Sequence, residues 1–208
     1  MNIKSTFDHS LKIIIVGDSG IGKSNFLFRF VDNKFSDIHQ STLGVDCRSK
    51  ICTLPSSKKK VKINIWDTVG QERFMSINKL YFQKVQGIIL MYDITDRSTY
   101  EKLPKWVEII NEEVYNIPLI LIGNKLDDEE NRIVRIGEGK AFAKENGFLF
   151  QETSAKSGKN VNNSMFLLCE KIISSLEDPN CNIKRFDTFD SLTIPMKKKE
   201  KSKTNQCC

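Results

Sequence analysis

A glycine-rich segment near the N-terminus carries residue types that bind phosphate. Residues 17–24 read GDSGIGKS and match the pattern G-x-x-x-x-G-K-[S/T], between a β-branched run and a segment with helical composition. The glycines let backbone N–H groups surround phosphate oxygens, Lys23 would reach the β- and γ-phosphates, and the Ser24 hydroxyl would ligate Mg²⁺. The segment predicts nucleotide binding, with an ordinary glycine turn as the alternative. Its predicted binding residues are Gly17, Asp18, Ser19, Gly20, Ile21, Gly22, Lys23 and Ser24.

A second group of polar residues follows an alternating apolar and polar run at 61–66. Asp67 directly follows this run and resembles a carboxylate that holds Mg²⁺ through water. Alternatively, it is an ordinary aspartate in a turn at the end of a strand. Gly70 can bring its N–H group against a γ-phosphate, and Gln71 can orient an attacking water. These residues predict nucleotide hydrolysis, with Gln71 as the catalytic residue.

Two further segments could recognise the base. The sequence NKLD at 124–127 follows an apolar run, and the Asp127 carboxylate can accept from both N1–H and the 2-amino group of guanine, a pair of donors that adenine lacks. The sequence SAK at 154–156 follows the last strand-like run, where a backbone N–H group can meet the guanine O6 oxygen. Together the segments predict a guanine nucleotide. The residues assigned to the base are Asn124, Lys125, Asp127, Ser154, Ala155 and Lys156.

The elements that must position these residues alternate between strand and helix patterns. The strand-like segments are 11–16, 45–54, 61–66, 87–92, 118–122 and 148–150, and the helix-like segments are 24–31, 99–114, 138–146 and 161–176. This alternation predicts an α/β fold, and the phosphate-binding motif at 17–24 after its first strand assigns it to the P-loop NTPase class. We expect a six-stranded, mostly parallel sheet with one antiparallel edge strand and helices on both faces. Because ligands bind at the carboxyl edge of such sheets, all four motifs are expected to meet there.

Composition excludes several other classes of protein. The 208 residues are 39% hydrophobic and 28% charged, which is ordinary for a globular domain. No apolar stretch approaches the ~20 residues of a membrane span, and the N-terminus has no secretory signal pattern. The six cysteines include no C-x-x-C pair, so a metal framework is not expected. The lysines of the tail have no interleaved aromatic residues, so we expect no nucleic-acid partner.

With these motifs in place, the chain resembles the Rab branch of the Ras superfamily of small GTPases. The resemblance covers about residues 9–176 and rests on GDSG at 17–20, WDT at 66–68, GQERF at 70–74, YDIT at 92–95 and the two terminal cysteines. It implies a switch between GTP and GDP states, with bound Mg²⁺ and slow intrinsic hydrolysis, that acts in vesicle traffic on cytosolic membranes. We expect a flexible N-terminus (1–8), a GTPase domain (9–177) and a basic tail (178–208), which is predicted to be disordered because the apolar period ends after Pro179.

The resemblance also implies further roles for individual residues. Thr42 would close on Mg²⁺ and the γ-phosphate, which makes Ser24, Thr42 and Asp67 the predicted metal ligands, and Phe35 would pack beside the guanine. Residues 35–47 and 68–80 would be two switch segments. Through them a monomeric protein would meet an exchange factor, a GTPase-activating protein, effectors, and a prenyl-binding escort or GDP-dissociation inhibitor.

The C-terminal tail contains two signals for membrane attachment. Cys207 and Cys208 end the chain, and by resemblance both would be geranylgeranylated. Residues 178–208 include seven basic and four acidic side chains, so the tail also carries part of the net charge of +6. Two lipid chains, or one chain with a basic patch, are what stable anchoring requires. We therefore expect a lipid-anchored protein with a cytosolic pool.

Three residues depart from the Rab pattern. Val69 stands where relatives usually have alanine, Cys47 where they usually have an aromatic residue, and His39 where many have tyrosine. A β-branched Val69 beside the γ-phosphate leaves open a second hypothesis, in which the protein is a hydrolysis-impaired GTP-binding membrane tether. Another P-loop NTPase, such as a kinase or ATPase, is a third reading that the 124–127 segment disfavours.

Overall fold

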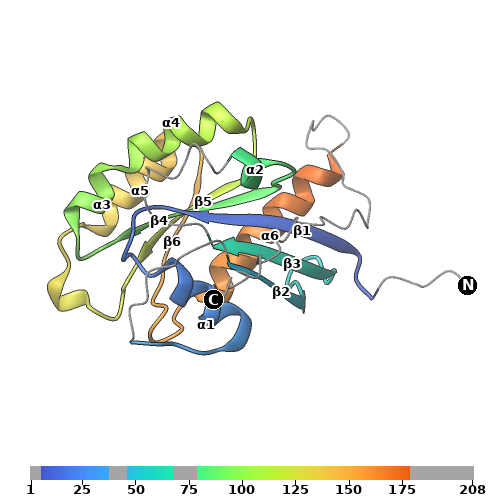
Figure 1. The fold of residues 1–208 in the computed structure, drawn as a ribbon, viewed down its shortest axis with the longest axis horizontal. Helices are drawn as coiled ribbons and strands as arrows, with labels where there is room; N and C mark the ends of the chain where they lie inside the picture. Colours follow the sequence, from blue (N-terminus) through green and yellow to red (C-terminus); the bar gives the residue numbers. More distant parts are fainter. Residues whose placement is uncertain (1–5, 38–45, 68–78, 179–208) are drawn as a thin grey trace, which may run out of the picture.

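The computed structural model describes residues 6–37, 46–67 and 79–178, and within them the chain forms one twisted sheet flanked by helices (Figure 1). The sheet has six strands in the order β2-β3-β1-β4-β5-β6. Only β2 and β3 pair antiparallel, and the other neighbours are parallel. The predicted α/β architecture with one antiparallel edge strand is confirmed.

The strands are β1 His9–Val16, β2 Asp46–Thr53, β3 Lys60–Asp67, β4 Gly87–Asp93, β5 Leu119–Asn124 and β6 Leu149–Glu152. The helices are α1 Lys23–Asp32, α2 Lys79–Phe82, α3 Arg97–Glu101, α4 Leu103–Glu113, α5 Ile136–Glu145 and α6 Val161–Glu177, with a 3-10 helix at Glu129–Asn131. No helix among the described residues is both long and apolar enough to cross a membrane.

The helical pattern at 99–114 predicts one helix, but the structure divides it into α3 and α4 at Lys102. Asp96 caps the start of α3 by accepting from the Ser98 N–H group, and Pro104 stands in the first turn of α4. Proline has no N–H group to donate and is tolerated in a first turn, so a new helix begins there. The expected helix at 138–146 also starts two residues earlier, at Ile136.

The core consists of two apolar layers, one on each face of the sheet. Along β1, Ile13 and Ile15 pack into the layer covered by α1 and α6, whereas Ile14 and Val16 pack into the layer covered by α4 and α5. Successive side chains of a strand point to opposite faces, so this continuous apolar run is buried on both sides. Figure 1 shows the helices divided between the two faces in this way.

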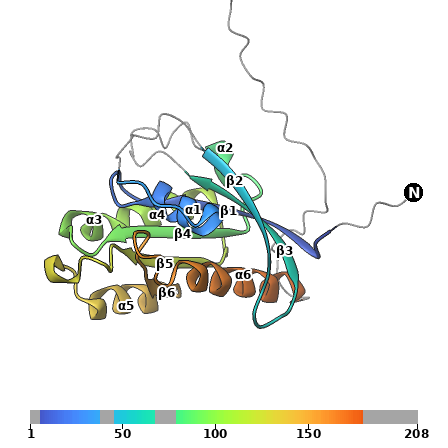
Figure 2. The ribbon, with the colours of Figure 1, turned by 90° about the horizontal axis from the view of Figure 1, so that it is seen from below.

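At one end of the molecule the β2–β3 connection lies beside the C-terminal part of α6 (Figure 2). The backbone N–H groups of Ser56 and Ser57 both donate to Glu170 Oε1, at 2.9 and 3.0 Å. Lys59 forms an ion pair with Glu177, the last residue of α6. The hairpin is therefore fastened to the end of the final helix.

The parallel strands bring polar residues together at one edge. Asp67, Asp93, Asn124 and Glu152 are the last residues of β3, β4, β5 and β6, and the phosphate-loop sequence 17–24 follows β1 directly. The carboxyl ends of parallel strands meet at the same edge of a sheet, where ligands of open α/β sheets bind. The segments predicted to bind the nucleotide thus start from neighbouring strands.

Candidate functional site

The loop between β1 and α1 has a backbone that requires glycine. Gly17 and Gly22 have φ angles of 135° and 93°, in the left-handed region that side chains disfavour. A Cβ atom at Gly17 would collide with the Met91 carbonyl oxygen, and one at Gly22 would come within 2.5 Å of Asn124 Nδ2. The loop therefore packs closely against residues of β4 and β5, and any larger residue at these two positions would push it away.

Lys23 lies buried at the start of α1, with its ammonium inside the loop. Its Nζ donates to the carbonyl oxygens of Gly17 at 2.9 Å and Asp18 at 2.6 Å. Burial lowers the pKa of this ammonium to about 8, against a partial opposing effect of Asp67 and Asp18. The arrangement places one desolvated cation within a ring of backbone groups, which suits a phosphate chain.

Ser24 and Asp67 form the second polar contact of the site, in which the Ser24 hydroxyl donates to Asp67 Oδ2. Asp67 is buried, and burial raises the pKa of its carboxyl group. Its other oxygen, Oδ1, is buried without a hydrogen-bond partner among the described residues. A hydroxyl and an unsatisfied carboxylate oxygen are hard oxygen ligands of the kind that Mg²⁺ prefers, so these residues fit the metal.

The carboxylate of Asp18 is engaged away from the interior of the loop. It forms an ion pair with Lys102 at 2.6 Å and accepts from Trp106 Nε1 at 2.9 Å. Asp18 and Trp106 are both buried. The Asp18 side chain therefore holds the loop to Lys102, between α3 and α4, and to Trp106 in α4, so the predicted contact with nucleotide would be made by its backbone.

Asn124 connects the phosphate loop to the two predicted base segments. Its Nδ2 donates to the Ile21 carbonyl oxygen at 2.8 Å, and its Oδ1 accepts from the Thr153 hydroxyl and the Ala155 N–H group, each at 3.2 Å. The side chain is 2% exposed. Three segments that follow three different strands are therefore held together by one amide.

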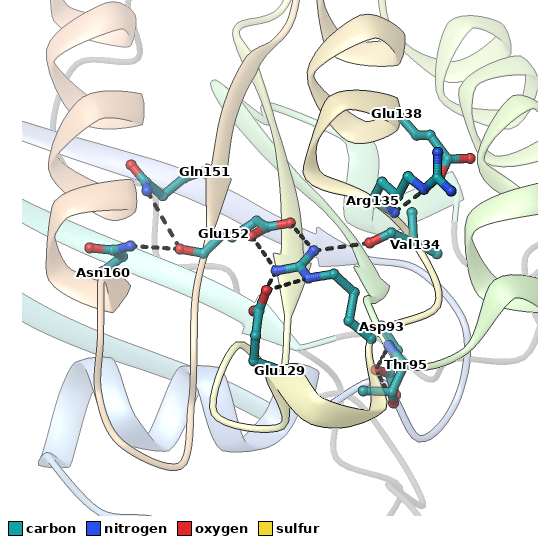
Figure 3. A network of polar contacts seen from close by, with 10 residues as sticks. Asp93, Thr95, Glu129, Val134, Arg135, Glu138, Gln151, Glu152 and Asn160 are labelled. Carbon is teal, nitrogen blue, oxygen red and sulfur yellow. Dashed lines mark hydrogen bonds and ion pairs between the residues drawn. The ribbon is translucent and has the colours of Figure 1, made fainter.

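The other residues of the 124–127 segment are also held by neighbours. Lys125 has a positive φ of 69° and pairs with Asp93 at 2.5 Å, and Asp93 in turn accepts from the Thr95 backbone and hydroxyl (Figure 3). Asp127 is exposed and accepts from the Ser154 hydroxyl at 2.5 Å. The segments at 124–127 and 154–156 therefore meet, as the motif order predicts.

Arg132, which was not predicted from the sequence, holds the segments next to the 124–127 and 154–156 residues. Arg132 pairs with Glu152 through two hydrogen bonds of 2.7 and 2.8 Å and with Glu129, and it donates to the Val134 carbonyl oxygen (Figure 3). Glu152 ends β6 and stands two residues before Ser154. Hydrogen bonds to Glu152 and then Glu129 raise the pKa of Arg132, which stays charged. No pattern around Arg132 in the sequence indicates this role.

Phe35 lies in the described region, packed against the core cluster that contains α1. The segment after it is tied to α1, because Asn25 donates to the Ser36 carbonyl oxygen at 2.9 Å and accepts from its N–H group. The predicted Thr42, Gly70 and Gln71 lie outside the described residues. The same is true of the other predicted sites and departures at His39, Val69, Cys207 and Cys208.

Comparisons with known proteins agree with this geometry. The sequence model of the Ras family matches residues 12–174. Ras-related protein SEC4 of Saccharomyces cerevisiae is 44% identical over 176 residues, covering 84% of this chain and 80% of the relative. Ras-related protein Rab-10 of Diplobatis ommata is 41% identical, covering 82% and 84%. Ras-related protein Rab-1D of Dictyostelium discoideum is 39% identical, covering 97% of both chains. The chain therefore belongs to the Ras family, within its Rab branch, and is a GTPase of the kind that regulates vesicle trafficking.

Proposed function

We propose that the guanine nucleotide lies along the carboxyl edge of the sheet, with its phosphates in the loop 17–24 and its base between the segments 124–127 and 154–156. The observation that carries this proposal is the position of Asn124, whose amide contacts both the phosphate loop and the 154–156 segment. A side chain in that position sets the spacing between phosphates and base. The exposed carboxylate of Asp127 would then accept from the guanine N1–H and amino groups.

Members of the Ras family use Mg²⁺ with their nucleotide. In this chain Ser24 and Asp67 would hold the metal, the latter through water, and Thr42 would join them. When bound, Mg²⁺ neutralises charge on the β- and γ-phosphates. Lys23 would add a second positive charge at the same oxygens, and Gln71 would orient the water that attacks the γ-phosphate in line with the leaving group.

We further propose that residues 35–47 and 68–80 change conformation with the nucleotide and present a surface to partners. These partners are an exchange factor, a GTPase-activating protein, effectors and a prenyl-binding escort. Support comes from the position of Asp67, which contacts Ser24 at the proposed metal site and directly precedes the second of these segments. Cys47, paired with Trp66 across β2 and β3, is exposed at the border of the first segment and would shape partner choice.

The nucleotide site can be tested through the metal. Ser24→Asn should weaken GTP binding more than GDP binding and reduce the dependence of affinity on Mg²⁺ concentration, because the amide displaces the hydroxyl ligand. Ser49→Asn, at an exposed position of β2, makes the same chemical change away from the site and should behave as wild type. Unchanged GTP affinity and unchanged magnesium dependence in Ser24→Asn would overturn the assignment of Ser24.

For the domain organisation, we propose a GTPase domain over 9–177 followed by a basic tail over 178–208 that carries two prenyl groups. The described strands and helices begin at His9 and end at Glu177, which supports this division. Prenylation at Cys207 and Cys208 would place the protein on the cytosolic face of membranes, and the tail lysines would add attraction to anionic lipids of about 1 kcal/mol each.

Lipid anchoring can be tested by fractionating cells that express tail variants. Replacing Cys207 and Cys208 by serine should move the protein to the soluble fraction, whereas Cys181→Ser should leave it on membranes. Replacing the lysines by alanine should weaken attachment in a salt-dependent way only; these are Lys197, Lys198, Lys199, Lys201 and Lys203. Membrane retention of the variant without terminal cysteines would exclude the lipid anchor.

A further inference from the structure

Arg29, in the last turn of α1, contacts the 154–156 segment although the two are far apart in sequence. Its Nε donates to the Ala155 carbonyl oxygen at 2.9 Å, and its Nη2 donates to the Lys156 carbonyl oxygen at 2.6 Å. Its Nη1 donates to the backbone and side-chain oxygens of Asn33, both at 3.1 Å, at the end of the same helix. The planar guanidinium is thus fixed on one side to its own helix and on the other to the loop.

The loop fits closely around the stem of this arginine. Gly158 has a φ of 83°, and a Cβ atom there would lie 3.4 Å from Arg29 Cδ. Other contacts hold the loop to itself: the Gly158 N–H group donates to the Ser154 carbonyl oxygen, and the Ser154 N–H group donates to the Lys159 carbonyl oxygen. Arg29 therefore contacts a compact turn, and moving the guanidinium would move that turn as a unit.

The helix that carries Arg29 also carries the phosphate residues. Lys23 and Ser24 lie in its first turn, and Arg29 follows Lys23 by six positions of regular helix. An α-helix rises 1.5 Å per residue, so this separation is a rigid spacer of roughly 9 Å. Asn124 links the phosphate loop directly to the 154–156 segment, and Arg29 links that segment to the helix that follows the phosphate loop.

We propose that Arg29 is a positioning residue for guanine recognition, which rests on the binding mode proposed above. By holding the Ala155 and Lys156 carbonyl oxygens, it fixes the two peptide planes that also contain the Lys156 and Ser157 N–H groups. The Ser157 N–H group donates to Ser154 Oγ at 2.9 Å, so the Lys156 N–H group is the one that would meet the 6-oxo oxygen of the base. The loss of Arg29 would therefore reduce selectivity for the 6-oxo group as well as overall affinity.

The test compares GDP with the diphosphate of 2-aminopurine riboside, which lacks the 6-oxo oxygen and with it the N1–H donor. Because the Asp127 contact is the same in wild type and variant, the change in preference between them reports on Arg29. Their relative affinities are measured by competition against a fluorescent GDP on the full-length protein. The preference for GDP should fall about tenfold in Arg29→Gln, since a charged hydrogen bond to each carbonyl is lost. Arg29→Lys keeps the positive charge but lacks the planar set of N–H donors. Its preference for GDP should therefore fall by less than in Arg29→Gln.

Arg48→Gln is the matched control. Arg48 contacts the same helix, through Asp32 and the ring of Phe28, but its described partners do not include the 154–156 segment. The Arg48→Gln variant removes one positive charge, as Arg29→Gln does, and should keep the wild-type preference for GDP. Equal loss of affinity for both nucleotides in Arg29→Gln, or an unchanged preference in a folded Arg29→Lys, would overturn the positioning role. Failure of the wild type to bind GDP would instead overturn the proposed binding mode.

Discussion

The side-chain amide of Asn124 donates to the carbonyl oxygen of Ile21 across 2.8 Å, although 103 positions separate the two residues. The bond joins the last residue of β5 to the middle of the phosphate loop. Because Asn124 is buried, breaking this bond would leave a polar group without water to replace its partner. The two halves of the proposed nucleotide site are thus fixed to each other by the protein itself.

The first prediction concerns choice of base. Asp127→Asn should lower affinity for GTP and raise affinity for XTP, because an amide can donate to the C2 carbonyl oxygen of xanthine where a carboxylate accepts from the guanine amino group. Relative affinities follow from competition with a fluorescent nucleotide. Asp128→Asn serves as the control at the adjacent position. Full GTP affinity with no gain for XTP in Asp127→Asn would contradict the proposed pocket.

The second prediction concerns protons. Burial lowers the pKa of Lys23 to about 8, whereas phosphate oxygens beside the ammonium would raise it again. Above pH 8, free protein has lost a proton that bound protein keeps, so GDP binding should take up a proton and affinity should fall as pH rises. Below pH 8 Lys23 is already charged and no such uptake is expected. Calorimetry at about pH 8.5 in two buffers of different ionisation enthalpy measures the uptake, and a value of zero would contradict the prediction.

A third prediction separates the side chain of Asp18 from its backbone. Asp18→Ala should destabilise the protein by about 1–3 kcal/mol, because the buried Trp106 Nε1–H group loses its acceptor. Asp18→Asn keeps an acceptor oxygen and loses mainly the ion pair with half-exposed Lys102, so it should cost about 1 kcal/mol or less. Urea unfolding at a fixed excess of GDP and Mg²⁺ measures both. Equal costs in the two variants would show that Trp106 does not depend on this acceptor.

The fourth prediction concerns Val69, which lies outside the described residues. Valine adds two methyl groups relative to alanine and has a stiff side chain, and a displacement of about 1 Å near the γ-phosphate can cost ~10²-fold in rate. Val69→Ala should therefore accelerate single-turnover GTP hydrolysis about tenfold or more, and Gln71→Leu should abolish that gain. A rate within about twofold of wild type in Val69→Ala would mark the valine as neutral, because loops repack more easily than cores.

The sheet and the location of the site could be predicted from the sequence because both depend on local patterns. Apolar runs at 87–92 and 118–122 indicate strands covered on both faces, and they form β4 and β5. The division between α3 and α4 was not predicted, because the apolar spacing continues across Lys102 and only the early proline at 104 marks the new start.

The supporting contacts could not be predicted in the same way. Arg29 meets Ala155 across 126 positions, and nothing in the sequence around either residue refers to the other. Arg132 lies closer to Glu152, but its pairing depends on the place of β6 beside β5 in the sheet. For Asp18 the motif indicates the backbone geometry correctly, while the direction of the carboxylate depends on α3 and α4.

The attachment of the β2–β3 hairpin to α6 provides a route by which a force on the end of α6 can reach the sheet. With the proposed lipid anchor, tension on the tail would act at the residue where α6 ends. Glu177 and Glu170 would pass part of that tension to Lys59 and to the backbone of the hairpin serines. The strain then reaches β2, whose far end borders the first proposed switch segment, so mechanical force on the tether and the conformation of that segment share one structural element.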